Sequence, residues 1–211
     1  MITTFNATMS RSTRILWLLE ELGAPFQVVP VAIARPDGSG GPDSANPHPL
    51  GQVPCIADDG EIIVESLAIW LHLSDLYPGA GIAPPPGHPR RAEYMGWLGL
   101  ATAVFEPLVV AVMTGTPLTD RQVAARAWLD ARIAAALARG PWLLWDRFST
   151  VDLVYASLLR FFPTALARTA AIDEWLERIA ARPALARVRE KDAITNAPSE
   201  NPSHPGGSRD P

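Results

Sequence analysis

The stretch VPCIADDGEIIVES, residues 53–66, carries the clearest indication of local structure in the chain. It holds two apolar runs, Val53–Ala57 and Glu61–Val64, which are separated by Asp58-Asp59-Gly60. This pattern predicts a β-hairpin, because glycine accepts the positive φ that a tight hairpin turn requires. From Ser66 an apolar segment continues to about Leu76, and its length suits a helix. A hairpin followed directly by a helix is therefore expected.

Upstream of this stretch, the sequence predicts a strand, a helix, a second strand and a loop. Apolar residues recur from Ile15 to Leu22 with the spacing of a buried helix face, and Gly23 follows at the expected C-cap. The strands are expected at Ile2–Phe5 and Phe26–Ile33, the second at a sheet edge because it contains proline. Residues 35–46 carry five glycines or prolines, which is typical of an irregular loop. This order of elements predicts a small mixed sheet with helices on its faces.

Downstream, residues 77–89 hold five prolines and three glycines, a density that predicts a linker. Helices are expected beyond it, and Ser149-Thr-Val-Asp152 predicts a capping box for one of them. The expected helices span about residues 90–113, 120–139, 150–162, 172–182 and 184–194. We therefore predict four segments: a first domain at 1–77, a linker at 78–89, an all-helical domain at 90–195 and a disordered tail at 196–211.

Composition narrows the class of protein. A net charge of -4 over 211 residues argues against a nucleic-acid partner, which would usually require a basic patch. We find no stretch near the roughly 18 apolar residues of a membrane span, and no signal peptide, so we expect a cytoplasmic protein without a membrane partner. The single cysteine, Cys55, excludes an internal disulfide and is interpreted as a small buried residue. His48 and His72 show no spacing that suggests a metal site.

Three short segments of the first domain are candidates for a binding site. The first is Val53-Pro54. A cis bond there would leave the backbone of Val53 free to pair with an extended peptide, whereas a trans proline would simply begin an edge strand. From the residues alone the trans interpretation is favoured, because cis bonds are only about 5% of those before proline.

The second candidate is Glu65-Ser66, at the junction of the hairpin and the helix. A helix N-terminus suits an anion, so Ser66 could bind a carboxylate while Glu65 takes an ammonium group. Alternatively, Ser66 only caps its own helix, which the residues alone favour. The third candidate is the polar loop Thr8–Ser12, where a helix N-terminus could stabilise a thiolate. Capping by Ser10 and Ser12 is an equally good interpretation of that loop.

Four blocks in order resemble the cytosolic glutathione transferases, of the bacterial, serine type. They are SRSTRILWLLEELG at 10–23, NPHPLGQVP at 46–54, Asp59-Gly60 with Glu65-Ser66, and PWLLWDRFSTVDL at 141–153. The resemblance covers about residues 1–190. It implies an α/β thioredoxin-like N-terminal domain that binds glutathione, followed by an all-α helical domain. Trp145 stands where the family usually has glycine before the aspartate.

The resemblance also implies roles for individual residues. Ser10 is expected to donate a hydrogen bond to the glutathione sulfur, with Ser12 as second choice. Val53 should pair its backbone with the cysteinyl residue of glutathione, next to a cis Pro54. Glu65 and Ser66 should hold the γ-glutamyl group. Gln52 stands where many relatives carry lysine, and Arg35 is the only cation of the loop 35–46, so the contacts to the glycyl carboxylate are expected to be weaker.

The activity that the resemblance implies is attack of glutathione thiolate on a hydrophobic electrophile or a peroxide, without a metal or an organic cofactor. Trp97, Phe105, Met9 and Met113 could line the electrophile pocket, although helical core is the favoured interpretation of each. A homodimer is expected. The alternative function is a non-catalytic binding protein or ligand carrier, because a fold does not fix a function.

Overall fold

The computed structural model describes residues 1–144 and 146–194. Trp145 and the predicted tail at 196–211 lie outside the described residues. A four-stranded sheet has the order β2-β1-β3-β4, in which β1 is parallel to β2 and antiparallel to β3, and β3 is antiparallel to β4. Its strands are β1 Ile2–Asn6, β2 Phe26–Pro30, β3 Cys55–Asp58 and β4 Glu61–Val64. The predicted mixed sheet is confirmed, with Pro30 in an edge strand.

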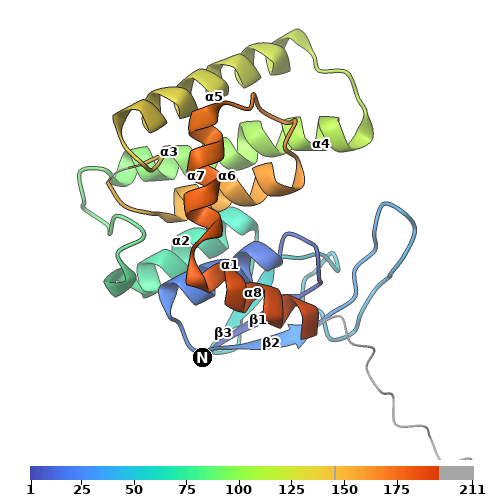
Figure 1. Ribbon diagram of the computed structural model, residues 1–211. Coiled ribbons are helices and arrows are strands. Elements are labelled where there is room, and N and C mark those ends of the chain that lie inside the picture. Colours follow the sequence, from blue (N-terminus) through green and yellow to red (C-terminus); the bar gives the residue numbers. More distant parts are fainter. Residues whose placement is uncertain (145, 195–211) are drawn as a thin grey trace, which may run out of the picture.

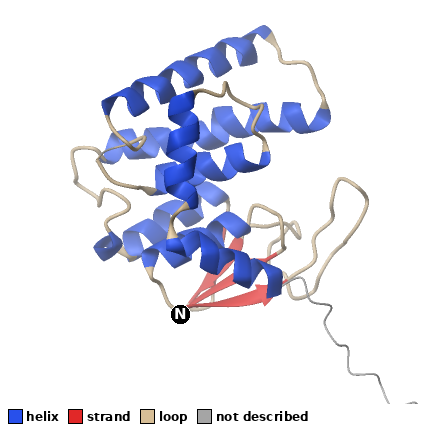
Figure 2. Ribbon diagram, viewed as in Figure 1, coloured by secondary structure: helices blue, strands red, loops and turns tan. Residues whose placement is uncertain are grey.

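Two helices belong to the sheet domain, and in Figure 1 they lie between the sheet and the helical domain. Helix α1 spans Thr13–Leu22 and ends at Gly23, whose φ of 63° provides the left-handed cap. Helix α2 spans Ser66–Leu76, as predicted. The residues 31–52 between β2 and β3 form no helix (Figure 2), in agreement with the glycine- and proline-rich composition of that segment.

The helical domain begins after a short 3-10 turn, η1 Pro78–Ala80. Its first helical stretch is α3 Arg91–Leu100, a π-helical segment η2 Ala101–Phe105 and α4 Glu106–Thr114. The sequence predicted one regular helix here. The π segment ends two residues before Pro107, which has no N–H to donate to the helix. The remaining helices are α5 Asp120–Arg139, α6 Thr150–Phe161, α7 Ala170–Ala180 and α8 Pro183–Ile194.

The start of α6 anchors the helical domain. Ser149 donates its hydroxyl proton to Asp152, which also accepts its backbone N–H, so the predicted capping box is confirmed. Asp152 is fully buried and accepts two further hydrogen bonds at 2.9 Å, from the Leu143 N–H and the Trp175 Nε1–H. Burial raises the pKa of this carboxyl group, and the four donors oppose that rise.

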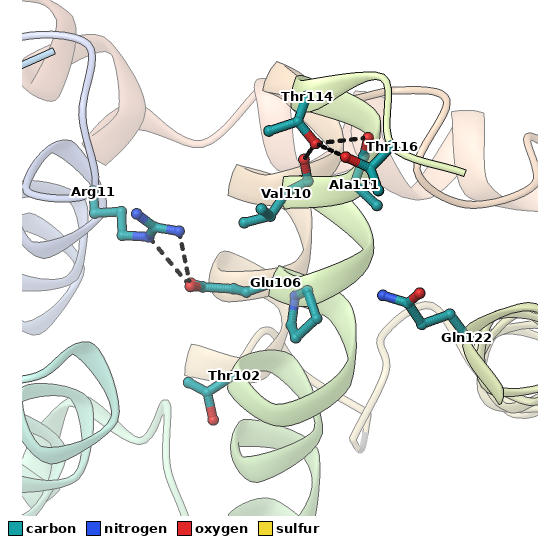
Figure 3. A pocket seen from close by; sticks show the side chains of 9 residues that line it. Arg11, Thr102, Glu106, Val110, Ala111, Thr114, Thr116 and Gln122 are labelled. Atoms are coloured by element: carbon teal, nitrogen blue, oxygen red, sulfur yellow. Dashed lines mark hydrogen bonds and ion pairs between the residues drawn. The ribbon is translucent and has the colours of Figure 1, made fainter. Parts of the chain in front are cut away.

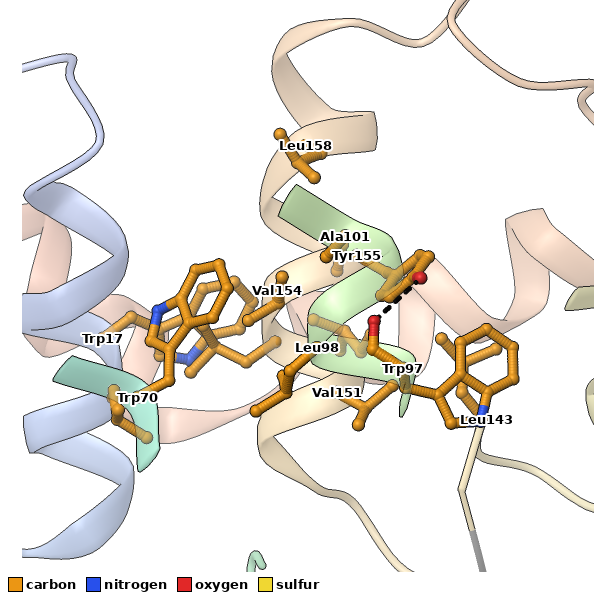
Figure 4. Close-up of a cluster of buried hydrophobic side chains, with 14 of the residues drawn as sticks. Trp17, Trp70, Trp97, Leu98, Ala101, Leu143, Val151, Val154, Tyr155 and Leu158 are labelled. Carbon is orange, nitrogen blue, oxygen red and sulfur yellow. Dashed lines mark hydrogen bonds between the residues drawn. The ribbon is translucent and has the colours of Figure 1, made fainter. Parts of the chain in front are cut away.

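One hydrophobic core runs through both domains. Trp17 and Trp70 of the sheet domain and Leu98 and Val154 of the helical domain belong to the same buried cluster (Figure 4). Helix α8 strengthens the connection, because it packs along α1 although its residues belong to the predicted helical domain. The domain boundaries at 77 and 90 stay a prediction.

The expectation that no stretch could span a membrane needs correction. The continuous helical stretch Arg91–Thr114 is long enough, and with a mean hydropathy of 1.7 apolar enough, to do so. Only part of this stretch lies in the core: Tyr94, Trp97 and Phe105 are almost completely buried, whereas Met95 and Met113 are exposed.

Candidate functional site

The sheet register brings the three predicted segments to one end of the sheet. Phe5, near the end of β1, pairs with Cys55 at the start of β3, and Cys55 pairs with Val64 at the end of β4. The loop after β1, residues 7–12, therefore lies beside the Val53-Pro54 segment before β3 and the Glu65-Ser66 segment after β4. Because β3 is antiparallel to β1 and to β4, the end of β1, the start of β3 and the end of β4 lie at the same end of the sheet, and the segments attached to them lie close together.

The two loop serines differ in the partners of their hydroxyl groups. Ser12 is completely buried; its hydroxyl lies 2.7 Å from Asn6 Oδ1, to which it donates, and accepts the Ala7 N–H at 3.0 Å. Ser10 is only half-buried, and its hydroxyl accepts the Ser12 N–H at 3.2 Å and lies 2.9 Å from the Ser12 hydroxyl. Ser12 occupies the N-cap position of α1 without a side-chain cap. The Ser12 hydroxyl thus stabilises the loop and does not cap the helix, whereas the Ser10 hydroxyl accepts the N–H two residues later, as a capping side chain does.

Helix α8 contacts this loop through Asp192, which is buried with 8% of its surface exposed. One carboxylate oxygen accepts from Asn6 Nδ2 at 2.9 Å and from the Thr13 hydroxyl at 3.2 Å, and the other accepts the Met9 N–H at 3.4 Å. The Thr8 hydroxyl donates to the Asp192 carbonyl oxygen at 3.0 Å. Met9 adopts a positive φ of 57°, which is unusual for a residue with a side chain. The loop conformation is therefore fixed by many contacts.

The Val53–Pro54 peptide bond is cis, as the resemblance implies. Strand β3 begins only at Cys55, so both residues precede the ladder. Asn46 Nδ2 donates to the Gln52 carbonyl oxygen at 3.1 Å and fixes the segment from the side. Val53 and Gln52 differ in exposure: Val53 is half-buried, and the side chain of Gln52 is exposed.

At the third segment, Glu65 has a φ of 72° and occupies the N-cap position of α2, again without a side-chain cap. Ser66 is the first helical residue and is 7% exposed. Because Ser66 does not stand at the N-cap, the interpretation that it only caps its own helix is wrong. Sparsely populated backbone angles of this kind persist where the surrounding structure determines them, and they occur often at binding sites. The first N–H groups of a helix have no acceptor within the helix, so those of α2 suit an anion.

Arg35 does not point its guanidinium to solvent. Its Nη2 donates to the Thr8 carbonyl oxygen at 2.8 Å, which ties the loop 31–52 to the loop that carries Ser10. The only cation of residues 35–46 thus has a structural contact, and the expected weak contact to the glycyl carboxylate stays a prediction.

A pocket of about 520 Å³ lies between the Ser10 loop and α4 (Figure 3). Arg11 reaches from the loop to Glu106 on α4, and its Nε and Nη2 lie 3.2 Å from Glu106 Oε2. The pocket is lined by Arg11, Thr102, Glu106, Pro107, Val110, Ala111, Thr114, Thr116 and Gln122.

The residues named from the sequence for an electrophile pocket lie elsewhere. Trp97 and Phe105 are buried in the core, as the favoured interpretation had it. Met9 and Met113 are 66% and 52% exposed, so the core interpretation is wrong for both. The polar residues Arg11 and Glu106 were missed, because no local pattern links a loop residue to a helix that begins 95 positions later. The role of Asp192 was missed for the same reason.

Cys55 and the two histidines are structural, as predicted. Cys55 is fully buried, and burial raises the pKa of its thiol to about 11, so the thiol is protonated at neutral pH. His72 Nε2 lies 2.8 Å from Asp58 Oδ2. His48 Nδ1 accepts the Leu50 N–H at 3.0 Å.

Comparison with known proteins gives one consistent result. Residues 1–75 match the family described as glutathione S-transferase, N-terminal domain. Glutathione S-transferase 3 of Zea mays is 27% identical over 206 residues, which cover 89% of this chain and 92% of that protein. Glutathione S-transferase GstA of Escherichia coli O157:H7 is 26% identical over 173 residues, which cover 78% and 86% of the two chains.

Solved structures agree with the sequence relatives. A sphingomonad glutathione S-transferase complexed with glutathione is 25% identical and has a TM-score of 0.71, over 91% of this chain and 99% of that chain. The predicted fold, a thioredoxin-like domain followed by a mostly helical domain, is confirmed.

Proposed function

We propose that this chain, whose fold is that of the glutathione transferases, is itself a glutathione transferase of the serine type. Relatives and solved structures of that name support an enzyme of this kind. In the proposed reaction, bound glutathione loses its thiol proton and the thiolate attacks an electrophilic or peroxide substrate. The observation that carries the proposal is the meeting of the Ser10 loop, the cis Val53–Pro54 bond and the N-terminus of α2 at one end of the sheet.

Ser10 is the proposed partner of the sulfur. A free thiol has a pKa of about 8.5, and lowering that pKa by about two units takes about 2.7 kcal/mol of differential interaction. One hydroxyl hydrogen bond and the N-terminus of α1 together supply an interaction of that order. The Ser10 hydroxyl can rotate its proton toward the sulfur while it still accepts the Ser12 N–H. Ser12 would have to give up its buried hydrogen bond to Asn6 Oδ1 in order to do so.

The rest of glutathione is proposed to lie along the other two segments. The backbone of Val53 pairs with the cysteinyl residue, as an added strand would. Ser66 and the first N–H groups of α2 bind the γ-glutamyl carboxylate, and the Glu65 carboxylate binds its ammonium group. Gln52 contacts the glycyl carboxylate with an uncharged amide, which is a weaker donor than lysine.

The test is a titration with glutathione in which the absorbance of the thiolate is followed for the wild type, Ser10→Ala and Ser12→Ala. We expect the wild type to bind glutathione with a thiol pKa about two units below that of the free thiol. Ser10→Ala should bind glutathione with nearly the free thiol pKa, and it should lose most of its activity.

Two outcomes would contradict the proposal. Binding without a thiolate signal in the wild type would favour the ligand carrier that the sequence left open. Failure of the wild type to bind glutathione at all would leave the fold without this chemistry. A normal thiolate signal in Ser10→Ala, together with its loss in a folded Ser12→Ala, would move the catalytic role to Ser12.

The proposal includes a homodimer, in which the first domain of one subunit packs against the helical domain of the other, and a cytoplasmic location. Both follow from the resemblance rather than from a contact in this chain. Sedimentation equilibrium measures the mass of the assembly. A mass of one chain at micromolar concentration would contradict the homodimer.

A further inference from the structure

The carboxylate of Glu106 is shared by two arginines beside the proposed site. Arg14 Nη1 lies 2.7 Å from Glu106 Oε1, and Arg11 contacts the other oxygen at 3.2 Å. Two guanidinium charges and one carboxylate charge leave one positive charge in excess. Arginine keeps its charge at neutral pH even where, as in Arg14, burial lowers its pKa.

The excess charge belongs to Arg11. The side chains of Arg14 and Glu106 are only 8% and 16% exposed, and their contact is the shorter one, so they form the neutral buried pair. The side chain of Arg11 is 46% exposed and lines the pocket. Figure 3 shows the Arg11 side chain extending from its loop toward Glu106 on α4.

The remaining lining of this pocket carries no charge. Val110, Ala111 and Pro107 form an apolar wall on α4, while threonines and Gln122 supply hydrogen-bonding groups. A volume of about 520 Å³ holds a small organic molecule. Such a molecule would lie with its apolar part on α4 and with one end near Arg11, which follows Ser10 directly in the sequence.

We propose that Arg11 selects an electrophile that carries a carboxylate group. This inference rests on the proposed function, since it assigns the second substrate of the same site. The edge of the planar guanidinium that does not face Glu106 can bind a carboxylate through two parallel N–H groups, which fixes the orientation of the substrate as well as its affinity. Arg11 also offsets the repulsion between an anionic substrate and the glutathione thiolate.

The test compares a chlorodinitrobenzene with its ring-carboxylated analogue, a chlorodinitrobenzoate. In both, the thiolate forms a bond to the ring carbon that carries chlorine, and chloride leaves with the electron pair of the broken bond. We expect the wild type to prefer the benzoate in kcat/KM. Arg11→Gln should lower kcat/KM for the benzoate about tenfold, the loss expected for one charge-assisted hydrogen bond, and change the value for the neutral substrate less than about twofold.

Two variants control for charge and for folding. Arg11→Lys keeps the charge without the planar fork and should retain part of the preference. Arg168→Gln removes an arginine of similar exposure, 42%, which pairs with Asp173 away from this pocket. The Arg168→Gln substitution should leave kcat/KM unchanged for both substrates. Arg11→Gln itself is expected to fold normally, because Glu106 keeps Arg14 as its partner.

Equilibrium binding of dinitrobenzoate and dinitrobenzene, which lack chlorine and do not react, separates this inference from the proposed function. A preference for dinitrobenzoate that Arg11→Gln abolishes would support the anion site. If the same protein showed no turnover, the proposed transferase activity would be wrong and the anion site would still stand. Equal binding of both compounds by the wild type would overturn the inference. So would an Arg11→Gln variant that raises KM for glutathione equally with both electrophiles, because Arg11 would then bind glutathione itself.

Discussion

At the scale of single residues, we expect the buried Ser12 to contribute mainly to stability and the half-buried Ser10 mainly to the reaction. Ser12→Ala removes the partner of the Ala7 N–H and of Asn6 Oδ1 in a dry interior, so we expect a loss of about 2 kcal/mol in the free energy of unfolding. Ser10→Ala should cost about 1 kcal/mol or less. Urea unfolding of both variants measures the difference, and equal losses would contradict the division of roles.

Ser66 offers a second prediction at this scale. Its hydroxyl stands at the first turn of α2, where it supports no cap of its own helix. Ser66→Ala should therefore raise the dissociation constant of glutathione about fivefold, the effect of one hydrogen bond to a charged group, while the pKa of the bound thiol stays unchanged. Calorimetric titration measures the first quantity. A shift of the thiol pKa in this variant would mean that Ser66 acts on the sulfur.

At the scale of elements, α8 supports the loop on which Ser10 lies. Asp192→Ala removes a buried acceptor of the Asn6 amide and of the Thr13 hydroxyl, so we expect a loss of about 2 kcal/mol in stability and about tenfold in kcat/KM. Glu190→Ala, an exposed position of the same helix, is the matched control. Equal effects of the two substitutions on activity would contradict the positioning role of Asp192.

The docking of α8 on α1 should also depend on pH. Burial alone would raise the pKa of Glu20, but hydrogen bonds from Lys191 and Arg187 outweigh burial and lower it. A carboxyl group whose pKa is lower in the folded state stabilises that state above its unfolded pKa, and this contribution is lost as the pH falls through the folded pKa. We expect Glu20→Gln to flatten the decline of unfolding free energy between neutral pH and about pH 3. An unchanged slope would contradict this linkage.

The elements that the sequence predicted well carry their signals locally. Helix α1 has a periodic apolar face and a glycine cap, and β4 and α2 follow a hairpin turn. Strand β3 begins two residues later than predicted because Pro54 has no N–H for the ladder. The contacts of Asp192 with residues up to 186 positions away could not be predicted, since no local pattern encodes them. For the same reason, the resemblance named the segments proposed to bind glutathione but not the residues of the pocket on α4.

At the scale of the whole molecule, the shared core predicts one cooperative unfolding transition. Separating the domains would expose Trp17 and Trp70 of one and Val154 of the other to water, at a cost of about 2 kcal/mol for each large apolar side chain. Far-UV circular dichroism and tryptophan fluorescence should therefore give coincident urea curves. Two separated transitions would show that the domains unfold independently.

The attachment of α8 beneath the Ser10 loop has a practical consequence for protein engineering. A shortened gene that stops before codon 192 would delete a buried acceptor of Asn6 and Thr13, and with it a support of the loop nearly two hundred positions earlier. Purification tags and fusion partners therefore belong well beyond that helix, with a spacer that lets it dock.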